Sequence, residues 1–472
     1  MIKRTKIVAT IGPATESEEM LSKLLLAGMN VMRLNFSHGD FDEHQNRVNN
    51  LRKAMEKTGK RAAILQDLGG PKIRIGNFST ESIMLKVGQT FTLTTDESVI
   101  GDEKRVYVNY PLLPKEVKPG HIIFLHDGKK KLEVKEVKGK EVVCKVLVGG
   151  DIKGRRGVNL PDSDLSIKSL TDKDLKDLEF GIKNKVDFIA LSFVRRPSDI
   201  VELREILKKK KSNVGIIAKI ETPQAISNID EIISLVDGIM IARGDLAIEV
   251  PFQKVPSYQK MMIKKCNDAG KPVITATQML ESMIKSPVAT RAEVSDVANA
   301  ILDGTDAIML SEETTLGEFP VNAVTVMSTI AKEMEENASE REIVRVGEKG
   351  ETQITDSITG SVVKTSHDVG AKVIVALTDS GFTARMVSRH KPHASILALT
   401  ANESTSNKLC LSFGCNPLTV PKYDSIQDII KMVRSYCLKE KLVKKGDKVV
   451  VTGGVPFNTK GLSTNMLMVE TI

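Results

Sequence analysis

Short apolar runs recur along the chain, and most of them precede a stretch in which apolar residues have helical spacing. The runs are nearly continuous in Val, Ile, Leu and Met, which is typical of strands covered on both faces. Eight runs are predicted as strands, at residues 6–10, 30–36, 62–67, 186–193, 214–221, 238–245, 272–278 and 307–312. Helices are predicted between them, for example at 17–27, 171–183, 198–209, 222–235, 258–269 and 289–302, with Thr171 and Asp174 as a capping box.

Repeated strand–helix units predict a parallel sheet, and eight of them favour a closed (β/α)8 TIM barrel. The alternative is a doubly wound open sheet. The barrel is preferred because the number of units is eight and because no Gly-x-Gly-x-x-Gly turn follows the first strand.

Residues 71–168 have a different pattern, in which apolar and polar residues alternate, as at 131–137. Turn residues interrupt the alternation at 118–120, 127–128 and 149–150. This predicts a small antiparallel β-barrel domain inserted in a loop of the larger barrel. Because such loops lie at the active-site face, the insertion is expected to act as a lid.

A third domain is predicted after the eighth unit. A helix at 321–336 leads into a Glu-rich stretch that ends near residue 353 and is expected to be a linker. Strand–helix alternation then resumes, with predicted elements at 354–368, 373–378, 383–390, 396–400, 425–440 and 449–452. The predicted organisation is a barrel domain (1–70 and 169–340), the lid (71–168) and a C-terminal α/β three-layer domain (341–472), in keeping with about 150 residues per domain.

The composition excludes several classes of protein. Of the 472 residues, 41% are apolar and 27% are charged, and no apolar run approaches the about 18 residues that span a bilayer. No signal peptide is evident at the start. Five Cys residues without a Cys-x-x-Cys pair indicate a reducing compartment, no disulfide framework and no zinc site. A cytoplasmic protein without a membrane partner is therefore expected.

The net charge of +8 raises the question of a nucleic-acid partner. The chain has no Trp and only 4% aromatic residues, so a platform for stacking bases is not expected. The basic excess also lies outside the barrel. Residues 71–168 contain 18 Lys and Arg against 13 Asp and Glu, and residues 341–472 contain 18 against 12.

Polar residues gather at the C-terminal ends of the predicted barrel strands, where barrel active sites lie. Such residues cost desolvation energy unless they are paired or used, so a whole ring of them is better explained by a site. The strands end in Arg33, Asn35, Ser37 and His38; Asp67; Ser192 and Phe193; Lys219 and Glu221; Arg243, Gly244 and Asp245; Thr275, Thr277 and Gln278; and Ser311, Glu312 and Glu313.

Glu221 and Asp245 are candidates for a divalent metal site. Adjacent strands lie about 4.8 Å apart, so both carboxylates can reach one hard cation, Mg²⁺ or Mn²⁺. The alternative is that each pairs with a neighbouring Lys or Arg. Lys219 lies on the same face of its strand as Glu221 and is suited to hold a phosphoryl group or an oxyanion, the alternative being a salt bridge with Glu221.

Three further side chains are suited to chemistry by their type alone. Arg33 and Arg74 suit bidentate contacts to phosphate or carboxylate, although a single Arg is more often a surface residue. Thr277 is able to pass on a proton through a water molecule, although a single Thr is usually structural. Residue type leaves these alternatives open.

Several segments are specific enough to identify a family: KIVATIGPAT (6–15), GMNVMRLNFSHG (28–39), GPKIRIG (70–76), RGVNLP (156–161), IAKIET (217–222), GIMIARGDLAIEVP (238–251), TATQMLESM (275–283), TRAEVSDVANAILDGTDAIMLSEET (290–314) and TDSGFTAR (378–385). Together they resemble the pyruvate kinase family, in the family's order and over nearly the whole chain. The resemblance implies a cytosolic glycolytic enzyme, usually a homotetramer. It would transfer the phosphoryl group of phosphoenolpyruvate to ADP and give ATP and pyruvate.

The resemblance also implies roles for single residues. Glu221 and Asp245 correspond to ligands of the substrate-bridging Mg²⁺ or Mn²⁺, Lys219 to the cation that stabilises the transferring phosphoryl group, and Arg33 to the substrate-phosphate arginine. The backbone at Gly244 and Asp245, with Thr277, corresponds to the carboxylate site, and Thr277 is also placed to relay a proton to the enolate carbon. Nucleotide contacts, with a second Mg²⁺ brought by ADP, fall on Asn35, Phe36, Ser37, His38, Arg74 and Arg156.

The chain departs from the family's potassium motif. Potassium-dependent members read Asp-Thr-Lys-Gly-Pro-Glu where this chain reads DLGGPK at 67–72. The family's K⁺ site would use Asn35, Ser37, Asp67 and the carbonyl of Leu68. Because Lys72 brings an ammonium where others carry a carboxylate, K⁺ is predicted to be dispensable.

Two other positions also differ from the family pattern. Arg156 replaces a Lys and keeps its charge. Glu312 replaces a Gly, a change for which the sequence offers no account.

The C-terminal domain contains a candidate effector loop, made of Thr378, Ser380, Gly381 and Thr383. It resembles the phosphate loop of the family's allosteric site, so a phosphorylated effector is expected, with an ordinary capped turn as the alternative. The basic excess of the lid and this domain is then interpreted as charge for handling phosphorylated metabolites.

Two other functions are weighed against this one. The first is another phosphoenolpyruvate-using, Mg²⁺-dependent barrel enzyme, such as a mutase or aldolase relative, which would not need the lid or the nucleotide-side arginines. The second is an inactive basic scaffold, which should have lost some of the predicted catalytic residues, and all of these are present.

Overall fold

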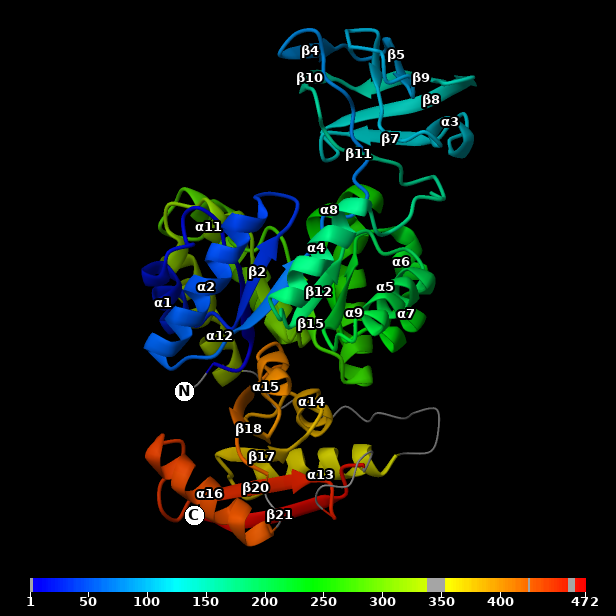
Figure 1. The fold of residues 1–472 in the computed structure, drawn as a ribbon. Helices are drawn as coiled ribbons and strands as arrows, with labels where there is room; N and C mark the ends of the chain where they lie inside the picture. Colours follow the sequence, from blue (N-terminus) through cyan, green and yellow to red (C-terminus); the bar gives the residue numbers. More distant parts are fainter. Residues whose placement is uncertain (1–2, 338–352, 423–424, 457–462) are drawn as a thin grey trace.

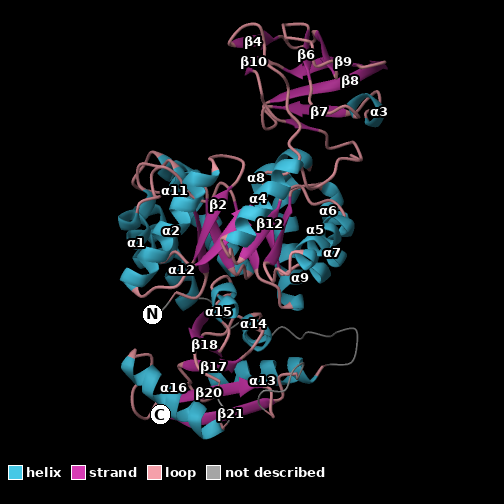
Figure 2. Cartoon of the chain, in the orientation of Figure 1, coloured by secondary structure: helices cyan, strands magenta, loops and turns pink. Residues whose placement is uncertain are grey.

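The computed structural model of the 472-residue chain describes residues 3–337, 353–422, 425–456 and 463–472. A large central barrel lies between a small all-β unit and a C-terminal α/β unit (Figure 1). Helices surround the barrel, whereas the small unit consists almost entirely of strands and loops (Figure 2). Among the described helices, none has the length and apolar composition that crossing a membrane requires.

Eight parallel strands close into the central barrel. Closure occurs between the first and last of them, where Lys6 pairs with Ala307. The predicted (β/α)8 barrel is therefore confirmed, and the open-sheet alternative is wrong. The strands are β1 (Lys6–Thr10), β2 (Val31–Asn35), β3 (Ala63–Asp67), β12 (Phe188–Leu191), β13 (Gly215–Ile220), β14 (Gly238–Ala242), β15 (Val273–Ala276) and β16 (Ala307–Leu310).

The barrel strands are buried on both faces, which explains their nearly continuous apolar runs. Along β1, Val8 belongs to the cluster of side chains inside the barrel, whereas Ile7 and Ala9 belong to the cluster between the strands and the helices. This alternation follows from the two-residue period of a strand.

Helices cover the outside of the barrel. The hydroxyl of Thr171 accepts a hydrogen bond from the N–H of Asp174 at the start of α4, which confirms the predicted capping box. The single helix predicted at 222–235 is wrong, because Asn228 divides it and its Nδ2 donates to the carbonyl of Arg195 at 3.0 Å. The helices are α1 (Glu18–Ala27), α2 (Phe41–Thr58), α4 (Asp172–Lys183), α5 (Pro197–Lys209), α6 (Pro223–Ser227), α7 (Ile229–Leu235), α8 (Arg243–Glu249), η1 (Phe252–Lys254), α9 (Val255–Ala269), η2 (Glu281–Ile284), α10 (Arg291–Asp303), α11 (Glu312–Thr315) and α12 (Pro320–Asn337).

The inserted unit has a hydrophobic core of its own. Its main sheet runs in the order β11-β7-β8-β9-β5-β6, and β10 pairs with β4. Most pairs are antiparallel, but β5 and β6 are parallel because residues 95–104 cross over before β6, so the prediction of a wholly antiparallel unit is wrong here. The elements are β4 (Ser82–Leu85), β5 (Thr90–Thr94), β6 (Arg105–Tyr107), α3 (Leu113–Glu116), β7 (Ile122–Leu125), β8 (Lys130–Lys138), β9 (Glu141–Val148), β10 (Gly150–Lys153) and β11 (Val158–Asn159).

The C-terminal unit contains a sheet in the order β19-β18-β17-β20-β21, in which β21 alone is antiparallel to its neighbour. The predicted linker lies almost wholly outside the described residues, and the exact domain boundaries stay a prediction. Strand β19 was not expected from the sequence, and its Pro417 is accommodated at the edge of the sheet. The elements are α13 (Ile354–Asp368), β17 (Val373–Leu377), α14 (Phe382–Ser388), β18 (Ser395–Thr400), α15 (Glu403–Leu409), β19 (Cys415–Thr419), α16 (Ile426–Lys439), β20 (Lys448–Gly453) and β21 (Met466–Thr471).

The C-terminal unit docks on the end of the barrel where the strands begin. Cys410 and Leu411, just after α15, belong to the same buried cluster as the side chains inside the barrel. Lys391 binds Asp306 at 2.9 Å, and both side chains are nearly fully buried. We call the opposite end of the barrel, where the strands finish and the inserted unit is attached, the barrel mouth.

Candidate active site at the barrel mouth

Four charged residues form a buried network at the ends of β2, β3 and β13. Nε and Nη2 of Arg33 lie 2.8 and 2.7 Å from Oδ2 of Asp67. Nζ of Lys219 lies 3.3 Å from Oδ1 of Asp67 and 3.0 Å from Oε1 of Glu221. The two carboxylate side chains are 1% exposed, so two cations neutralise two buried anions. The salt bridge weighed as an alternative for Lys219 is therefore present, within a larger network.

The network sets the protonation states of its members. Burial disfavours the charged ammonium of Lys219, but the carboxylates of Asp67 and Glu221 outweigh it and raise the pKa of Lys219. Burial also acts against the charge of Asp67, yet Lys219 and Arg33 hold the pKa of Asp67 below its ordinary value. For Glu221 burial prevails, and the nearby Asp245 adds to it, so the pKa of Glu221 is raised despite the attraction of Lys219.

Two hydroxyl groups fix the cations, and neither has a role among those predicted from the sequence. The ammonium of Lys219 donates to Oγ of Ser192 at 2.7 Å, and that hydroxyl lies 2.8 Å from the carbonyl of Leu68, to which it donates. Nη1 of Arg33 donates to Oγ1 of Thr10 at 2.8 Å. Thr10 is the last residue of β1, and Ser192 follows β12. A hydroxyl residue at the end of a barrel strand was the signal in the sequence that could have identified both.

Glu221 and Asp245 follow the consecutive strands β13 and β14 and offer hard oxygen donors. Oε2 of Glu221 accepts from the N–H of Phe193 at 2.8 Å, whereas Asp245 lies half-buried in the first turn of α8. The raised pKa of Glu221 beside Asp245 marks a pair of like charges that a cation would neutralise. The described residues contain no group of three or more His, Cys, Asp or Glu side chains suited to a metal. The pair therefore fits a hard divalent ion that takes its other ligands from substrate or water.

Thr277 and Gly244 meet across the ends of β15 and β14. The N–H of Gly244 donates to Oγ1 of Thr277 at 2.7 Å, and this hydroxyl donates to the carbonyl of Ala276 at 2.6 Å. Thr277 has a φ of 70°, a left-handed conformation that is unusual for a β-branched residue. The hydroxyl and the Gly244 backbone thus share one position at the mouth.

The loop after β2 carries four of the predicted nucleotide residues. Oδ1 of Asn35 accepts from the N–H of Ser37 at 3.1 Å. The side chain of Phe36 is buried and stacks on His44 with ring centroids 4.1 Å apart. Its N–H donates to the carbonyl of Asp67 at 2.9 Å, and its carbonyl accepts from Nζ of Lys173 at 2.7 Å. Partial burial lowers the pKa of His38, and the nearby charges of Lys72, Arg74 and Arg33 act in the same direction.

Glu312 and Arg156 have different surroundings. The carboxylate of Glu312 acts on the pKa of His38 in the opposite sense to these cations. Arg156 lies in the inserted unit, where it lowers the pKa of His126 together with burial. Arg74 lies beside Arg156 in the inserted unit, because Arg74 forms a β-bridge with Gly157 and its Nη1 donates to the carbonyl of Arg155 at 3.0 Å.

The predicted potassium residues are already engaged with protein groups. Asn35 and Asp67 are register partners on β2 and β3, and Asp67 is held by Arg33 and Lys219. The carbonyl of Leu68 accepts from Ser192. Lys72 is exposed, in the segment that leads to the inserted unit.

The predicted effector residues Thr378, Ser380 and Gly381 lie in the turn between β17 and α14, and Thr383 lies in the first turn of α14. Gly381 has a φ of 81° and precedes the first residue of α14. Oγ1 of Thr383 lies 2.9 Å from Oγ1 of Thr464, and both side chains are buried. Thr378 is buried and Ser380 is exposed.

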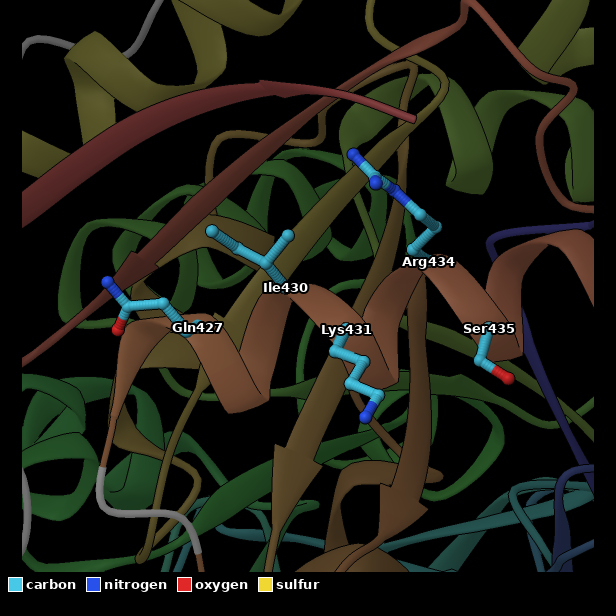
Figure 3. A pocket seen from close by; sticks show the side chains of 5 residues that line it. All are labelled: Gln427, Ile430, Lys431, Arg434 and Ser435. Carbon is cyan, nitrogen blue, oxygen red and sulfur yellow. The ribbon is translucent and has the colours of Figure 1, made fainter.

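A shallow cavity of about 410 Å³ lies on α16, far from the mouth. Its lining residues all come from this one helix, and Figure 3 shows them spread along its length. They are Gln427, Ile430, Lys431, Arg434 and Ser435. Arg434 already binds Glu470 of β21 at 3.1 Å, and the cavity holds no pair of carboxylates, so the chemistry is assigned to the mouth.

Comparisons with known proteins agree on one family. The family model for the pyruvate kinase barrel domain matches residues 2–324, and the model for the pyruvate kinase alpha/beta domain matches residues 356–470. The pyruvate kinase of Geobacillus stearothermophilus is 46% identical over 476 positions, and that of Staphylococcus aureus strain MRSA252 is 44% identical over 474. Each alignment covers 100% of this chain and 81% of the relative. A solved pyruvate kinase structure from Cryptosporidium parvum has a TM-score of 0.94 and 38% identity, covering 99% of this chain and 96% of that one.

Proposed function

The chain belongs to the pyruvate kinase family and transfers the phosphoryl group of phosphoenolpyruvate to ADP, and on this premise we propose a role for each residue at the barrel mouth. The observation that carries the proposal is the network of Arg33, Asp67, Lys219 and Glu221, in which two cations are held in fixed positions at a buried site. Phosphoryl transfer depends mainly on positioning and on neutralising charge, and such a network supplies both.

Arg33 and Lys219 bind the phosphoryl group of the substrate. The guanidinium of Arg33 is held by Asp67 and Thr10, so its orientation is fixed before the substrate arrives. Lys219 keeps its proton because two carboxylates raise its pKa, and its ammonium therefore stabilises negative charge on the phosphoryl oxygens in the transition state.

Glu221 and Asp245 would hold the divalent metal that the family requires, which we assign as Mg²⁺ or Mn²⁺ because the donors are hard oxygens. When bound, this ion supplies positive charge opposite the anionic groups of the substrate. The N–H that Phe193 donates to Glu221 orients that carboxylate. Burial raises the pKa of Glu221 and the nearby Asp245 adds to it, so a cation held between the two carboxylates would favour their charged forms.

Gly244, Asp245 and Thr277 receive the substrate carboxylate, and Thr277 relays the proton to the enolate carbon. The proposal is supported by the hydrogen bond from Gly244 to Thr277, which sets the hydroxyl beside backbone N–H groups at the start of α8. Because a hydroxyl both donates and accepts, Thr277 is able to pass on a proton from water while it keeps its contact with Gly244.

ADP binds between the loop after β2 and the inserted unit. Asn35, the carbonyl of Phe36, Ser37 and His38 line the barrel side, and Arg74 and Arg156 come from the inserted unit. The inserted unit acts as a lid that excludes water and so limits hydrolysis. The approach of Gly128 to Ile248 of α8, where a Cβ on the glycine would lie 3.6 Å away, supports a lid that closes on the mouth.

Potassium is dispensable in this chain. The family's K⁺ site would use Asn35, Ser37, Asp67 and the carbonyl of Leu68, and the contacts that Arg33, Lys219 and Ser192 make there support the proposal. The charge of Lys72, which acts on the nearby His38, would take the place of the monovalent ion.

Three further proposals concern the whole protein. The turn with Thr378, Ser380, Gly381 and Thr383 binds a phosphorylated effector, the enzyme is a homotetramer, and it works in the cytoplasm. A reducing compartment is supported by the state of the five cysteines, all of which are free and buried.

The test of the function is a coupled assay of ATP formation from ADP and phosphoenolpyruvate with Mg²⁺ or Mn²⁺. We expect turnover with at least one of these ions. If circular dichroism shows folded protein and no ATP forms with either Mg²⁺ or Mn²⁺, the proposal is overturned.

A further inference from the structure

Two consecutive residues at the end of β15 have left-handed backbones. Thr277 has a φ of 70° and Gln278 a φ of 54°. A residue held in such a conformation is strained and persists only where its surroundings determine it. The structure must therefore contain groups that hold this segment in place.

Arg243, the first residue of α8, is such a group. Its Nη2 donates to the carbonyl of Thr277 at 2.8 Å, and its Nε donates to the carbonyl of Ala276 at 3.3 Å. One guanidinium thus binds both carbonyls that flank the Thr277 backbone.

The guanidinium is itself held from the outer helices. Nη1 and Nη2 of Arg243 lie 2.7 Å from Oδ1 and Oδ2 of Asp296 on α10, which is a bidentate pair. Nη1 also donates to Oε1 of Gln259 on α9 at 3.3 Å. The Arg243 side chain is only 13% exposed, so these contacts leave it little freedom.

Arg243 also fixes the partner of the Thr277 hydroxyl. The next residue is Gly244, whose N–H donates to Oγ1 of Thr277 at 2.7 Å. A Cβ at position 244 would lie 3.3 Å from that oxygen, so the two backbones approach closely. Arg243 therefore acts on both partners of the Gly244–Thr277 hydrogen bond. Its backbone leads directly to the donor, Gly244, and its side chain holds the backbone of the acceptor, Thr277.

We propose that Arg243, held by Asp296, is a positioning residue that aims the Thr277 hydroxyl at the reacting carbon. The inference deepens the proposed function, because it rests on the role of Thr277 as the proton relay. The guanidinium of Arg243 donates to Asp296, Gln259 and two backbone carbonyls, so it acts through Thr277 and not on the substrate.

The experiment measures the proton step separately from phosphoryl transfer. The variants are Asp296→Asn, which removes the carboxylate, and Arg243→Lys, which removes the planar fork. The readout is exchange of pyruvate methyl hydrogens with D₂O, followed by NMR in the presence of Mg²⁺, together with KM for phosphoenolpyruvate. We expect exchange to fall about tenfold or more in both variants, since a displacement of about 1 Å can cost up to a hundredfold, while KM changes far less.

A matched control and a double variant make the test specific. Arg204→Lys weakens another Arg–Asp ion pair, a more exposed one with Asp237 at 2.9 Å at the other end of the barrel, and should leave exchange unchanged. In a Thr277→Ala background, Asp296→Asn should cause no further loss, because its effect passes through Thr277. Thermal unfolding of each variant identifies any that fails to fold, and the other variant of the pair then carries the test.

The outcomes separate the inference from the proposed function. If Thr277→Ala reduces exchange but Asp296→Asn and Arg243→Lys do not, the positioning role is wrong and the role of Thr277 stands. Losses that add fully to that of Thr277→Ala would also overturn the positioning role. If Thr277→Ala itself leaves exchange intact, the relay role fails, and the inference fails with it.

Discussion

Asp67 is the residue at which the charges of the barrel mouth balance. Its carboxylate is 1% exposed and accepts from Arg33 on one oxygen while it pairs with Lys219 on the other. A buried carboxylate without such partners would be strongly unfavourable, so the two cations and this anion stabilise one another. The sequence located all three at strand ends, but it did not show that Ser192 and Thr10 would hold the cations, because strand order does not specify which hydroxyl meets which charge.

The exchange of Lys72 for Glu should create a dependence on K⁺. The wild type should work in sodium- and potassium-free buffer, whereas K⁺ should raise the turnover of Lys72→Glu about tenfold or more, since a nearby unit charge is worth about 1–4 kcal/mol. Steady-state assays with tetramethylammonium as the counter-ion measure this. Lys86→Glu is the control, because Lys86 is an exposed lysine of the inserted unit. A wild type that loses most of its rate without K⁺ would contradict the role of Lys72.

His44 should make the stability of the protein depend on pH. Burial, with help from Arg47, lowers the pKa of His44 from 6.5 to about 4. The unfolded chain therefore binds a proton on this ring at a higher pH than the folded chain does. The free energy of unfolding should fall as the pH decreases from about 6.5 toward 4.

Urea denaturation at several pH values checks the role of His44. Nε2 of the ring donates to the carbonyl of His38 at 3.0 Å, and His44→Gln offers an amide donor to that carbonyl without the titration. The variant should show a shallower loss of stability below pH 6.5. The remaining slope has a second source in His390, whose pKa burial also lowers to about 4. Equal slopes in the wild type and the variant would show that His44 does not contribute.

At the scale of elements, the sequence predicted the barrel well because its strands are buried on both faces and its helices on one. Nearly continuous apolar runs therefore mark the strands, and helical spacing of apolar residues marks the helices between them. The division of the predicted helix at Asn228 was not visible, because the apolar spacing continues across the break between α6 and α7. The parallel pairing of β5 with β6 was missed for a related reason, since strand direction depends on a crossover whose path the local pattern does not encode.

The segment after α15 offers a test of how the C-terminal unit is anchored. Leu411 is fully buried and belongs to the cluster inside the barrel. Leu411→Ala should lower the free energy of unfolding by about 2–5 kcal/mol, through lost burial and the cavity left behind. Leu26→Ala, at a side chain that is 65% exposed, should change it by no more than about 0.5 kcal/mol. Chemical denaturation followed by circular dichroism compares the two, and similar small effects would mean that the segment does not anchor the unit.

At the scale of the whole molecule, the distribution of charge follows the three units. At the mouth of the barrel, Arg33 pairs with Asp67 and Lys219 with Glu221, so these charges cancel. The excess of basic residues lies in the inserted unit and the C-terminal unit. The two units that we propose to meet phosphorylated ligands carry +5 and +6, and the barrel carries −3, which gives the net charge of +8.

The central claim is that Lys219 stabilises the transferring phosphoryl group, whereas Thr277 handles the proton. Lys219→Met tests it most directly when ATP formation and the exchange of pyruvate methyl hydrogens are measured on the same preparation. The variant should fold, because Arg33 still neutralises Asp67 and the raised pKa of Glu221 allows that residue to take up a proton. We predict that ATP formation falls about a hundredfold or more while methyl exchange falls by a much smaller factor. ATP formation close to that of the wild type, or an equal loss of both rates in folded protein, would contradict the account.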